Sequence, residues 1–276
     1  MIRILAITRT LSLAFAAAAW CASVAIALAT RPAHAVIIET GDGTGNTTAP
    51  LDDPGWHNVV SRGSHSAVYL GDRWIITALH VGAGSVTIDG EDYAMLPNSS
   101  VILKNSDGTT ADLVLFRIDR KPPVSDAWIS GSTPANRAAL IMIGKGLDRG
   151  TPFRSGDFLG FRWGDRAPMR WGTSEVSTRP AFGRVQGTET FAARFSIAGS
   201  KHEAIAARGD SGGAAFARGA GRWELAGILL AVDSFQDQPP RTAVYGNQTY
   251  IADLSVYHDQ IRRIMQGTPA AIPPAD

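Results

Sequence analysis

The chain has 276 residues, 45% of them hydrophobic and 18% charged, which is the composition of a globular protein with enough material for one large or two small domains. Its formal net charge is +1, but without the three arginines of the first 35 residues the chain carries 23 basic and 25 acidic side chains. A nearly neutral body lacks the basic face that a nucleic-acid partner requires, so that class of partner is excluded.

The N-terminus has the pattern of an export signal. Arg3 and Arg9 precede an uncharged apolar run over residues 11–29, and Ala33-His34-Ala35 forms a small-x-small cleavage site. The alternative is an uncleaved membrane anchor, because the run is nearly long enough to span a bilayer. The position of the cleavage site favours a signal peptide over residues 1–35. We therefore expect a secreted chain, extracellular or periplasmic, that starts at Val36 and has no membrane attachment.

The number and position of cysteines limit the cross-links and the chemistry available to the chain. The only cysteine, Cys21, lies inside the expected signal. The mature chain is therefore exported without any disulfide to stabilise its core, and neither a cysteine nucleophile nor a thiolate metal site is available to it.

The first half of the mature chain predicts short strands. Residues 36–56 are rich in Gly, Thr, Asp and Pro without periodicity, which predicts an extended arm. A two-residue hairpin turn is expected at Gly71-Asp72. The strand candidates here are 66–70, 74–78, 86–88, 101–103 and 113–118. A linker is expected near residues 121–137.

The second half repeats this style and ends in a helix. Its strand candidates are 139–143, 158–163, 191–197, 214–216, 223–231 and 248–251. Apolar residues recur mostly on one face over 254–265, which predicts a helix there, and 267–276 reads as a flexible tail. Many short strands at close spacing favour barrels or a sandwich over βαβ units.

One segment has the composition of a nucleophile loop. In Gly209-Asp210-Ser211-Gly212-Gly213, glycines flank a serine and allow a tight, unhindered turn. Such a turn aims consecutive backbone N–H groups at one point, so the N–H groups of Gly209 and Ser211 could form an oxyanion hole. The plain alternative is a glycine-rich turn without chemistry.

Two further segments supply a base and an acid. His80 follows a buried strand, and the near-neutral pKa of histidine suits proton transfer. Asp112 opens a strongly apolar strand, where a carboxylate could hold an imidazole in one tautomer. Taken singly, His80 is more often an ordinary surface or core histidine, and Asp112 a solvated turn residue.

Together the three segments resemble the trypsin/chymotrypsin family. That family carries Thr-Ala-x-His, Asp-[Ile/Leu]-x-Leu-Leu and Gly-Asp-Ser-Gly-Gly in this chain order, and this sequence has all three over residues 64–265. The resemblance implies a serine endopeptidase with Ser211 as nucleophile, His80 as general base and Asp112 orienting His80. It also implies an all-β fold of two antiparallel six-stranded β-barrels with the active site in the cleft between them, plus a C-terminal helix. We expect the barrels at 36–125, which includes the arm, and 126–266.

The resemblance also assigns a specificity pocket. Its base corresponds to Ile205, six residues before Ser211, where trypsin-like enzymes carry an Asp that binds Lys or Arg. Leu230 takes the place of a family serine that supports the triad Asp, and Val232 takes the place of a pocket-wall glycine. We therefore expect cleavage after small or medium apolar residues.

Family members activate through the residue before the nucleophile. In the family this Asp, here Asp210, pairs with the α-ammonium of a newly exposed apolar N-terminus. Signal cleavage would expose Val36-Ile37, so export itself could complete the site. Against this, Ile38-Glu39 replaces the usual Gly-Gly.

Other functions stay open at this point. The chain could be a catalytically silent, protease-like binding protein, or an α/β-hydrolase esterase, because Gly-x-Ser-x-Gly also fits that class. No cofactor is expected, although Asp89, Glu91 and Asp92 could bind a structural calcium ion, as some family members do. The expected partner is a protein or peptide substrate, and the expected state is a monomer.

Overall fold

The computed structural model describes residues 36–177 and 182–267. The predicted signal peptide and the tail from residue 268 onward lie outside the described residues. Strands dominate the described part, and its one α-helix is α1 (Leu254–Met265). An all-β fold with a C-terminal helix, as predicted, is therefore confirmed.

The first barrel is a seven-stranded antiparallel sheet in the order β6-β5-β2-β3-β4-β8-β7. Its strands are β2 (Val59–Arg62), β3 (His65–Gly71), β4 (Trp74–Ala78), β5 (Val86–Ile88), β6 (Glu91–Tyr93), β7 (Val101–Lys104) and β8 (Thr110–Arg117). Beyond β6, Met95 forms an antiparallel bridge with Ile118 at the end of β8, so the sheet curls back on itself.

The hairpin between β3 and β4 differs by one residue from the prediction. Gly71 pairs with Trp74, so the two turn residues are Asp72 and Arg73 rather than Gly71 and Asp72. Both have positive φ, 42° and 68°, as the tight turns of β-hairpins require. Gly71 instead allows Asp126 to pack closely against the backbone, because a Cβ at this position would lie 2.6 Å from the carboxyl carbon of Asp126.

The second barrel is another seven-stranded antiparallel sheet, in the order β12-β9-β16-β17-β19-β14-β13. Its strands are β9 (Ala139–Gly144), β12 (Arg170–Glu175), β13 (Phe182–Val185), β14 (Thr188–Arg194), β16 (Ala214–Gly219), β17 (Arg222–Val232) and β19 (Gln248–Asp253). Val176, just after β12, bridges to Ala193 of β14 and brings the two sides of the sheet together. Each sheet thus has one strand more than the six expected.

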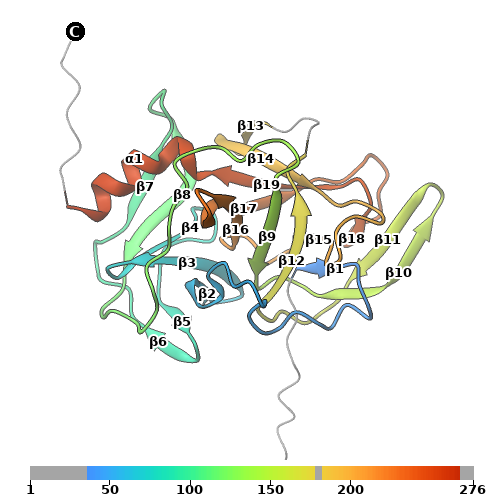
Figure 1. The fold of residues 1–276 in the computed structure, drawn as a ribbon, viewed down its shortest axis with the longest axis horizontal. Helices are drawn as coiled ribbons and strands as arrows, with labels where there is room; N and C mark the ends of the chain where they lie inside the picture. The colour runs from blue at the N-terminus through green and yellow to red at the C-terminus, as the bar shows by residue number, and fades with distance from the viewer. Residues whose placement is uncertain (1–35, 178–181, 268–276) are drawn as a thin grey trace, which may run out of the picture. The chain divides into compact units, whose positions relative to one another are not determined.

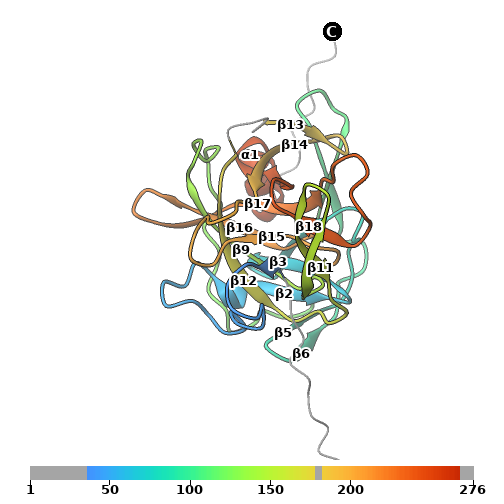
Figure 2. The same cartoon turned by 90° about the vertical axis from the view of Figure 1, so that its right-hand side faces the viewer.

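Two small sheets extend the second barrel. β1 (Ile37–Ile38) pairs with β15 (Ala204–Ile205), and β10 (Arg149–Ser155) pairs with β11 (Phe158–Trp163), which pairs with β18 (Thr242–Val244). The β10–β11 hairpin projects from the second barrel (Figure 1), and Figure 2 shows β18 beside β11. A short 3-10 helix, η1 (Trp56–Asn58), precedes β2.

One apolar core joins the two barrels. It contains Val68 and Leu115 from the first sheet, Ile143 and Ile228 from the second, and Tyr257 of α1. The helix begins at its N-cap Asp253, whose carboxylate accepts the N–H of Ser255. Because this core is continuous, the strand ends of both barrels are held at fixed positions where they meet.

Candidate active site

His80 and Asp112 lie at neighbouring strand ends of the first barrel. Ala78, the last residue of β4, is the register partner of Leu113 on β8, which places His80 next to Asp112. Asp112 Oδ1 accepts the backbone N–H of His80 at 2.8 Å, and Asp112 Oδ2 lies 2.6 Å from His80 Nδ1. Asp112 is only 8% exposed, and its backbone N–H donates to the hydroxyl oxygen of Thr188, on the second barrel, at 2.6 Å.

This arrangement determines which nitrogen of the His80 ring carries the proton. A carboxylate accepts only, so Nδ1 carries the proton that it shares with Asp112, and Nε2 is left as the basic nitrogen. The side chain of His80 is 39% exposed, so Nε2 has access to a substrate. The pair can take up a proton at Nε2 while the buried carboxylate balances the new charge.

Ser211 comes from the second barrel, in the loop that leads into β16. The loop is tied to the first barrel by the Ser66 N–H, which donates to the carbonyl of Ser211 at 3.1 Å. A Cβ on Gly212 would lie 2.0 Å from the Ser66 carbonyl oxygen and 2.2 Å from Thr77 Oγ1, three residues before His80. Only glycine fits so close, so the loop brings Ser211 to the end of the histidine strand.

The Ser211 hydroxyl donates to the carbonyl oxygen of Leu230 at 3.2 Å. The hydroxyl proton must therefore leave Leu230 before it can be donated to His80. Hydrogen bonds of this kind are often formed only once substrate is bound. Leu230 thus touches the nucleophile through its backbone, whatever its side chain does.

Two backbone donors of the loop are unoccupied. Among the described residues, neither the Gly209 N–H nor the Ser211 N–H has an acceptor, whereas the intervening Asp210 N–H donates to Ala207 at 3.1 Å. Gly209 has φ = 100°, a left-handed conformation suited to glycine. Open donors beside the Ser211 hydroxyl are what an oxyanion requires.

Asp210 is fully buried behind this loop. Its carboxylate accepts the N–H groups of Gly146 and Ala207, each at 2.7 Å, and that of Val36. Burial raises the pKa of Asp210 to about 7, and the backbone N–H groups of Ala207, Gly146 and Val36 only partly offset this increase. Val36 itself is 0% exposed, so the start of the expected mature chain lies inside the protein.

A small cavity of about 110 Å³ adjoins Ser211. Its lining is mostly apolar and comprises Trp163, Ala206, Ala207, Arg208, Ser211, Leu229, Leu230, Ala231 and Val232. Two residues that sequence reasoning assigned to the pocket, Leu230 and Val232, are therefore among them.

Ile205 is not among the lining residues, although Ala207, Trp163 and Val232 of the lining pack in the same apolar cluster. It is the register partner of Ile37 in the β1–β15 pair, and it is buried in a cluster with Phe161 and Phe195. The arm strand thus occupies the space beside Ile205 and turns it into a core residue. Trp163, at the end of β11, was missed, because nothing in the sequence links a tryptophan 48 positions upstream to Ser211.

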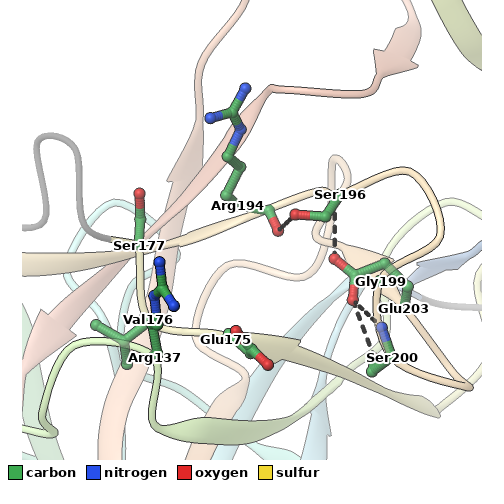
Figure 3. Close-up of a pocket in the computed structure, with 9 residues that line it drawn as sticks. All are labelled: Arg137, Glu175, Val176, Ser177, Arg194, Ser196, Gly199, Ser200 and Glu203. Atoms are coloured by element: carbon green, nitrogen blue, oxygen red, sulfur yellow. Dashed lines mark hydrogen bonds between the residues drawn. The ribbon is translucent and has the colours of Figure 1, made fainter.

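A larger cavity, about 360 Å³, is separate from these residues. It is polar, and its lining is Arg137, Glu175, Val176, Ser177, Arg194, Ser196, Gly199, Ser200 and Glu203. Figure 3 shows the buried Glu203 carboxylate bound to Ser196 and Ser200, with the Arg194 guanidinium directed away from it. None of the catalytic residues predicted from the sequence is among the residues that line this cavity.

The acidic loop proposed for calcium has other partners. Asp89 lies 2.9 Å from His57 Nδ1, Asp92 accepts the Thr87 hydroxyl at 2.7 Å, and Glu91 lies 3.6 Å from Arg120. Over residues 36–177 and 182–267, no three His, Cys, Asp or Glu side chains gather as metal ligands would. The calcium site therefore stays a prediction from the sequence.

Comparisons with known proteins agree with this geometry. A family model, Trypsin, matches residues 44–254. No curated protein sequence matches the chain. Among solved structures, the chain resembles an inactive-form, serine-to-alanine mutant of Rv3671c from M. tuberculosis H37Rv, with 13% identity, a TM-score of 0.50, and coverage of 82% of this chain and 95% of that one. A second structure, the inactive form of Rv3671c protease, has 14% identity, a TM-score of 0.48, and coverage of 76% and 90%.

The pairing of the strands narrows the class. In both large sheets every paired strand is antiparallel, which excludes the parallel sheet of an α/β-hydrolase. In the described part of the chain, no helix has the length and apolar character needed to span a bilayer. With a matching family model over most of its length and an antiparallel two-barrel fold, the chain belongs to the trypsin family and is a trypsin-like serine protease.

Proposed function

We propose that the protein is a secreted endopeptidase that cleaves peptide bonds through an acyl-enzyme on Ser211. His80 Nε2 takes the hydroxyl proton as Ser211 Oγ attacks the carbonyl carbon, and the N–H groups of Gly209 and Ser211 bind the resulting oxyanion. Collapse breaks the C–N bond, and His80 returns the proton to the leaving amine. Water then hydrolyses the ester by the same route.

The observation that carries this proposal is the His80–Asp112 pair. Two hydrogen bonds, at 2.8 and 2.6 Å, fix both the backbone and the ring of His80 against a buried carboxylate. A surface histidine without a catalytic role does not require two hydrogen bonds to a buried carboxylate. The open N–H groups of the Ser211 loop support the same chemistry from the second barrel.

The shape of the cavity supports a preference for small or medium apolar residues before the scissile bond. An apolar cavity of about 150 Å³ just admits a benzene ring, and the one beside Ser211 is smaller, at about 110 Å³. Its lining contains Arg208 and no carboxylate. An entering Lys or Arg side chain would lose its hydration without gaining a counter-charge.

We further propose that signal cleavage activates the enzyme. Removing residues 1–35 converts the buried Val36 N–H into an ammonium group that faces the Asp210 carboxylate. That ion pair would satisfy a carboxylate now held by backbone N–H groups, with the cation Arg170 nearby. It would stabilise the loop that presents Gly209 and Ser211.

A fluorophosphonate probe tests the proposed function. The chain beginning at Val36 should be labelled, and mass spectrometry should place the adduct on Ser211. Ser211→Ala or His80→Ala should lower kcat on an alanyl peptide roughly 10⁵–10⁶-fold, and the double variant little further. A folded chain that stays unlabelled would instead be the silent binding protein, the second candidate that the sequence left open.

The secretory route has its own test. Expressed from its own first residue in a bacterial host, the protein should appear outside the cytoplasm, and its N-terminal sequence should read Val-Ile-Ile. Retention of residues 1–35 in the exported product would contradict the signal-cleavage and activation proposals, and a product that stays in the cytoplasm would contradict export.

A further inference from the structure

The arm after Val36 lies along the second barrel and is tied to it. Ile37 and Ile38 pair with β15, and the Glu39 N–H donates to the carbonyl of Glu203 at 2.8 Å. The arm then leaves the sheet, so the carbonyls of the next residues need donors from elsewhere. In a chain whose expected mature form has no cysteine, no disulfide can supply this attachment.

Arg149 supplies the first set of donors. Its Nη1 donates to the carbonyl of Ile38 at 3.2 Å and to that of Glu39, and its Nη2 donates to Gly41 at 2.5 Å. The same guanidinium lies 4.4 Å above the Phe161 ring. A planar group with several fixed donors suits this task better than a lysine ammonium would.

Arg170 supplies the second set. It is 0% exposed, and its guanidinium donates to the carbonyls of Gly43 and Thr44, the latter at 3.2 Å. Burial lowers the pKa of Arg170 to about 10, so it stays charged at neutral pH. A buried cation of this kind is costly unless its donors are used, and here the arm carbonyls accept hydrogen bonds from Nη1 and Nη2.

The segment that carries Arg149 also reaches the catalytic loop. The Gly146 N–H donates to Asp210 at 2.7 Å, and the Leu147 N–H donates to the carbonyl of Arg208 at 2.8 Å. Arg149 is moreover the register partner of Trp163, which lines the cavity beside Ser211. Four consecutive residues thus contact the arm, the Ser211 loop and the wall of the cavity.

We infer that Arg149 and Arg170 are positioning residues for the reaction. They hold residues 38–44 so that the Val36 nitrogen reaches Asp210, and Arg149 connects this attachment to the loop that presents Gly209 and Ser211. Neither side chain touches the substrate. The inference rests on the proposed function, because it assigns the arm a role in ordering that same site.

The test compares two like substitutions on strand β10, in the chain beginning at Val36. Arg149→Met removes the donors to the arm but keeps an unbranched apolar stem over Phe161. Arg154→Met, on the same strand with an exposed side chain, is the matched control. Hydrogen exchange of the amides of residues 37–43 reports the arm, and steady-state kinetics on an alanyl peptide reports the site.

We expect Arg149→Met to speed exchange in the arm at least tenfold and to lower kcat tenfold or more with a smaller change in KM. Arg154→Met should change neither, and Arg149→Lys should recover part of kcat by keeping one donor. Arg170→Lys, a milder change at the buried site, should act in the same direction as Arg149→Met.

The outcomes are separable. If hydrogen exchange of the arm amides is unchanged in Arg149→Met, the proposed attachment of the arm by Arg149 is overturned, whatever the activity of the variant. Faster exchange with an unchanged kcat overturns the positioning role and leaves the proposed function intact. A wild-type chain that is folded, exchanges slowly in the arm and never reacts with the phosphonate overturns the proposed function, and the catalytic role of the two arginines with it, although the attachment stands.

Discussion

At the scale of single residues, the candidate site depends on three polar side chains, two at neighbouring strand ends and one in a loop. Asp112 holds both the backbone N–H and the ring of His80, while Ser211 comes from a loop of the other barrel. Each residue lies inside a short motif with its own local rationale, which is why all three could be named from the sequence. His80 and Asp112 meet within the first barrel, whereas the position of Ser211 relative to them depends on the interface between the barrels.

Asp112→Asn should lower kcat by roughly 10⁴-fold while the fold is retained. An amide can still accept the His80 backbone N–H through its oxygen, but its NH₂ group then faces Nδ1 and forces the proton onto Nε2. Steady-state kinetics with the alanyl peptide measures the loss. The control is Asp107→Asn, because Asp107 is an exposed carboxylate paired with Arg184 at 2.6 Å. Wild-type activity in Asp112→Asn would assign the orienting role to another acid.

Val232→Ala should widen the cavity beside Ser211. We expect kcat/KM for a substrate with leucine before the scissile bond to rise tenfold or more relative to alanine, the scale of a lost methylene contact. Val256→Ala, on the exposed side of α1, should leave the ratio unchanged. A ratio that stays constant in Val232→Ala would show that another residue limits the depth of the cavity.

Residue-level prediction was incomplete where the surroundings of a residue depend on partners that are distant in the sequence. Ile205 was assigned from its distance in sequence to Ser211, but the arm strand pairs with it and buries it. Three further residues are distant in sequence from the site or the arm, and only the folded structure brings them into contact with it: Trp163, Arg149 and Arg170. No local pattern marks them, since their partners lie from about 50 to more than 100 residues away.

At the scale of elements, the strands with a plain apolar pattern were predictable and the irregular ones were not. The helix at 254–265 has the predicted bounds, because its apolar spacing and its N-cap agree. Strand β10 contains Gly150 and Pro152 and lacks alternation, so it was missed. It forms because β11 pairs with it across the hairpin.

The Ser211 loop predicts a contrast between two glycines of similar conformation. Gly212 (φ = 85°) and Gly221 (φ = 84°) share the left-handed region, but only Gly212 lacks room, since a Cβ there would lie 2.0 Å from the Ser66 carbonyl. Gly221→Ala should cost about 1–2 kcal/mol in the free energy of unfolding and leave phosphonate labelling intact. Gly212→Ala should cost more and abolish labelling. Equal effects would show that crowding does not position this loop.

At the scale of the whole molecule, the second barrel and the arm meet at Asp210. The carboxylate is tied to Gly146 and Ala207 of the second barrel and to Val36 of the arm, so one buried group responds to the state of the N-terminus. Sequence resemblance predicted this role for Asp210. It could not predict that the buried carboxylate is already bound to the Val36 N–H, which requires the β1–β15 pairing.

This buried group gives a pH test of activation. In the unprocessed chain, where Val36 offers an amide N–H, Asp210 has a pKa of about 7 when folded, against about 4 when unfolded. We expect the same of a chain extended by one residue before Val36, because its Val36 nitrogen is also an amide. The folded state therefore keeps a proton that the unfolded state releases, and stability falls as pH rises from about 4 to about 7. In the chain that starts at Val36, the ammonium group lowers the pKa of Asp210, and this loss disappears.

We therefore expect the free energy of unfolding of the two forms, measured in urea at pH 4.5 and 7.5, to diverge as pH rises, with the Val36 form the more stable at pH 7.5. Asp210→Asn has no carboxylate to titrate, so in that background the difference between the two forms should not grow with pH. Parallel pH profiles of the two wild-type forms would show that the Val36 nitrogen does not bind Asp210 as an ammonium group. In that case the backbone N–H groups and the nearby cation Arg170 would suffice to hold Asp210, and removal of the signal would not by itself order the Ser211 loop.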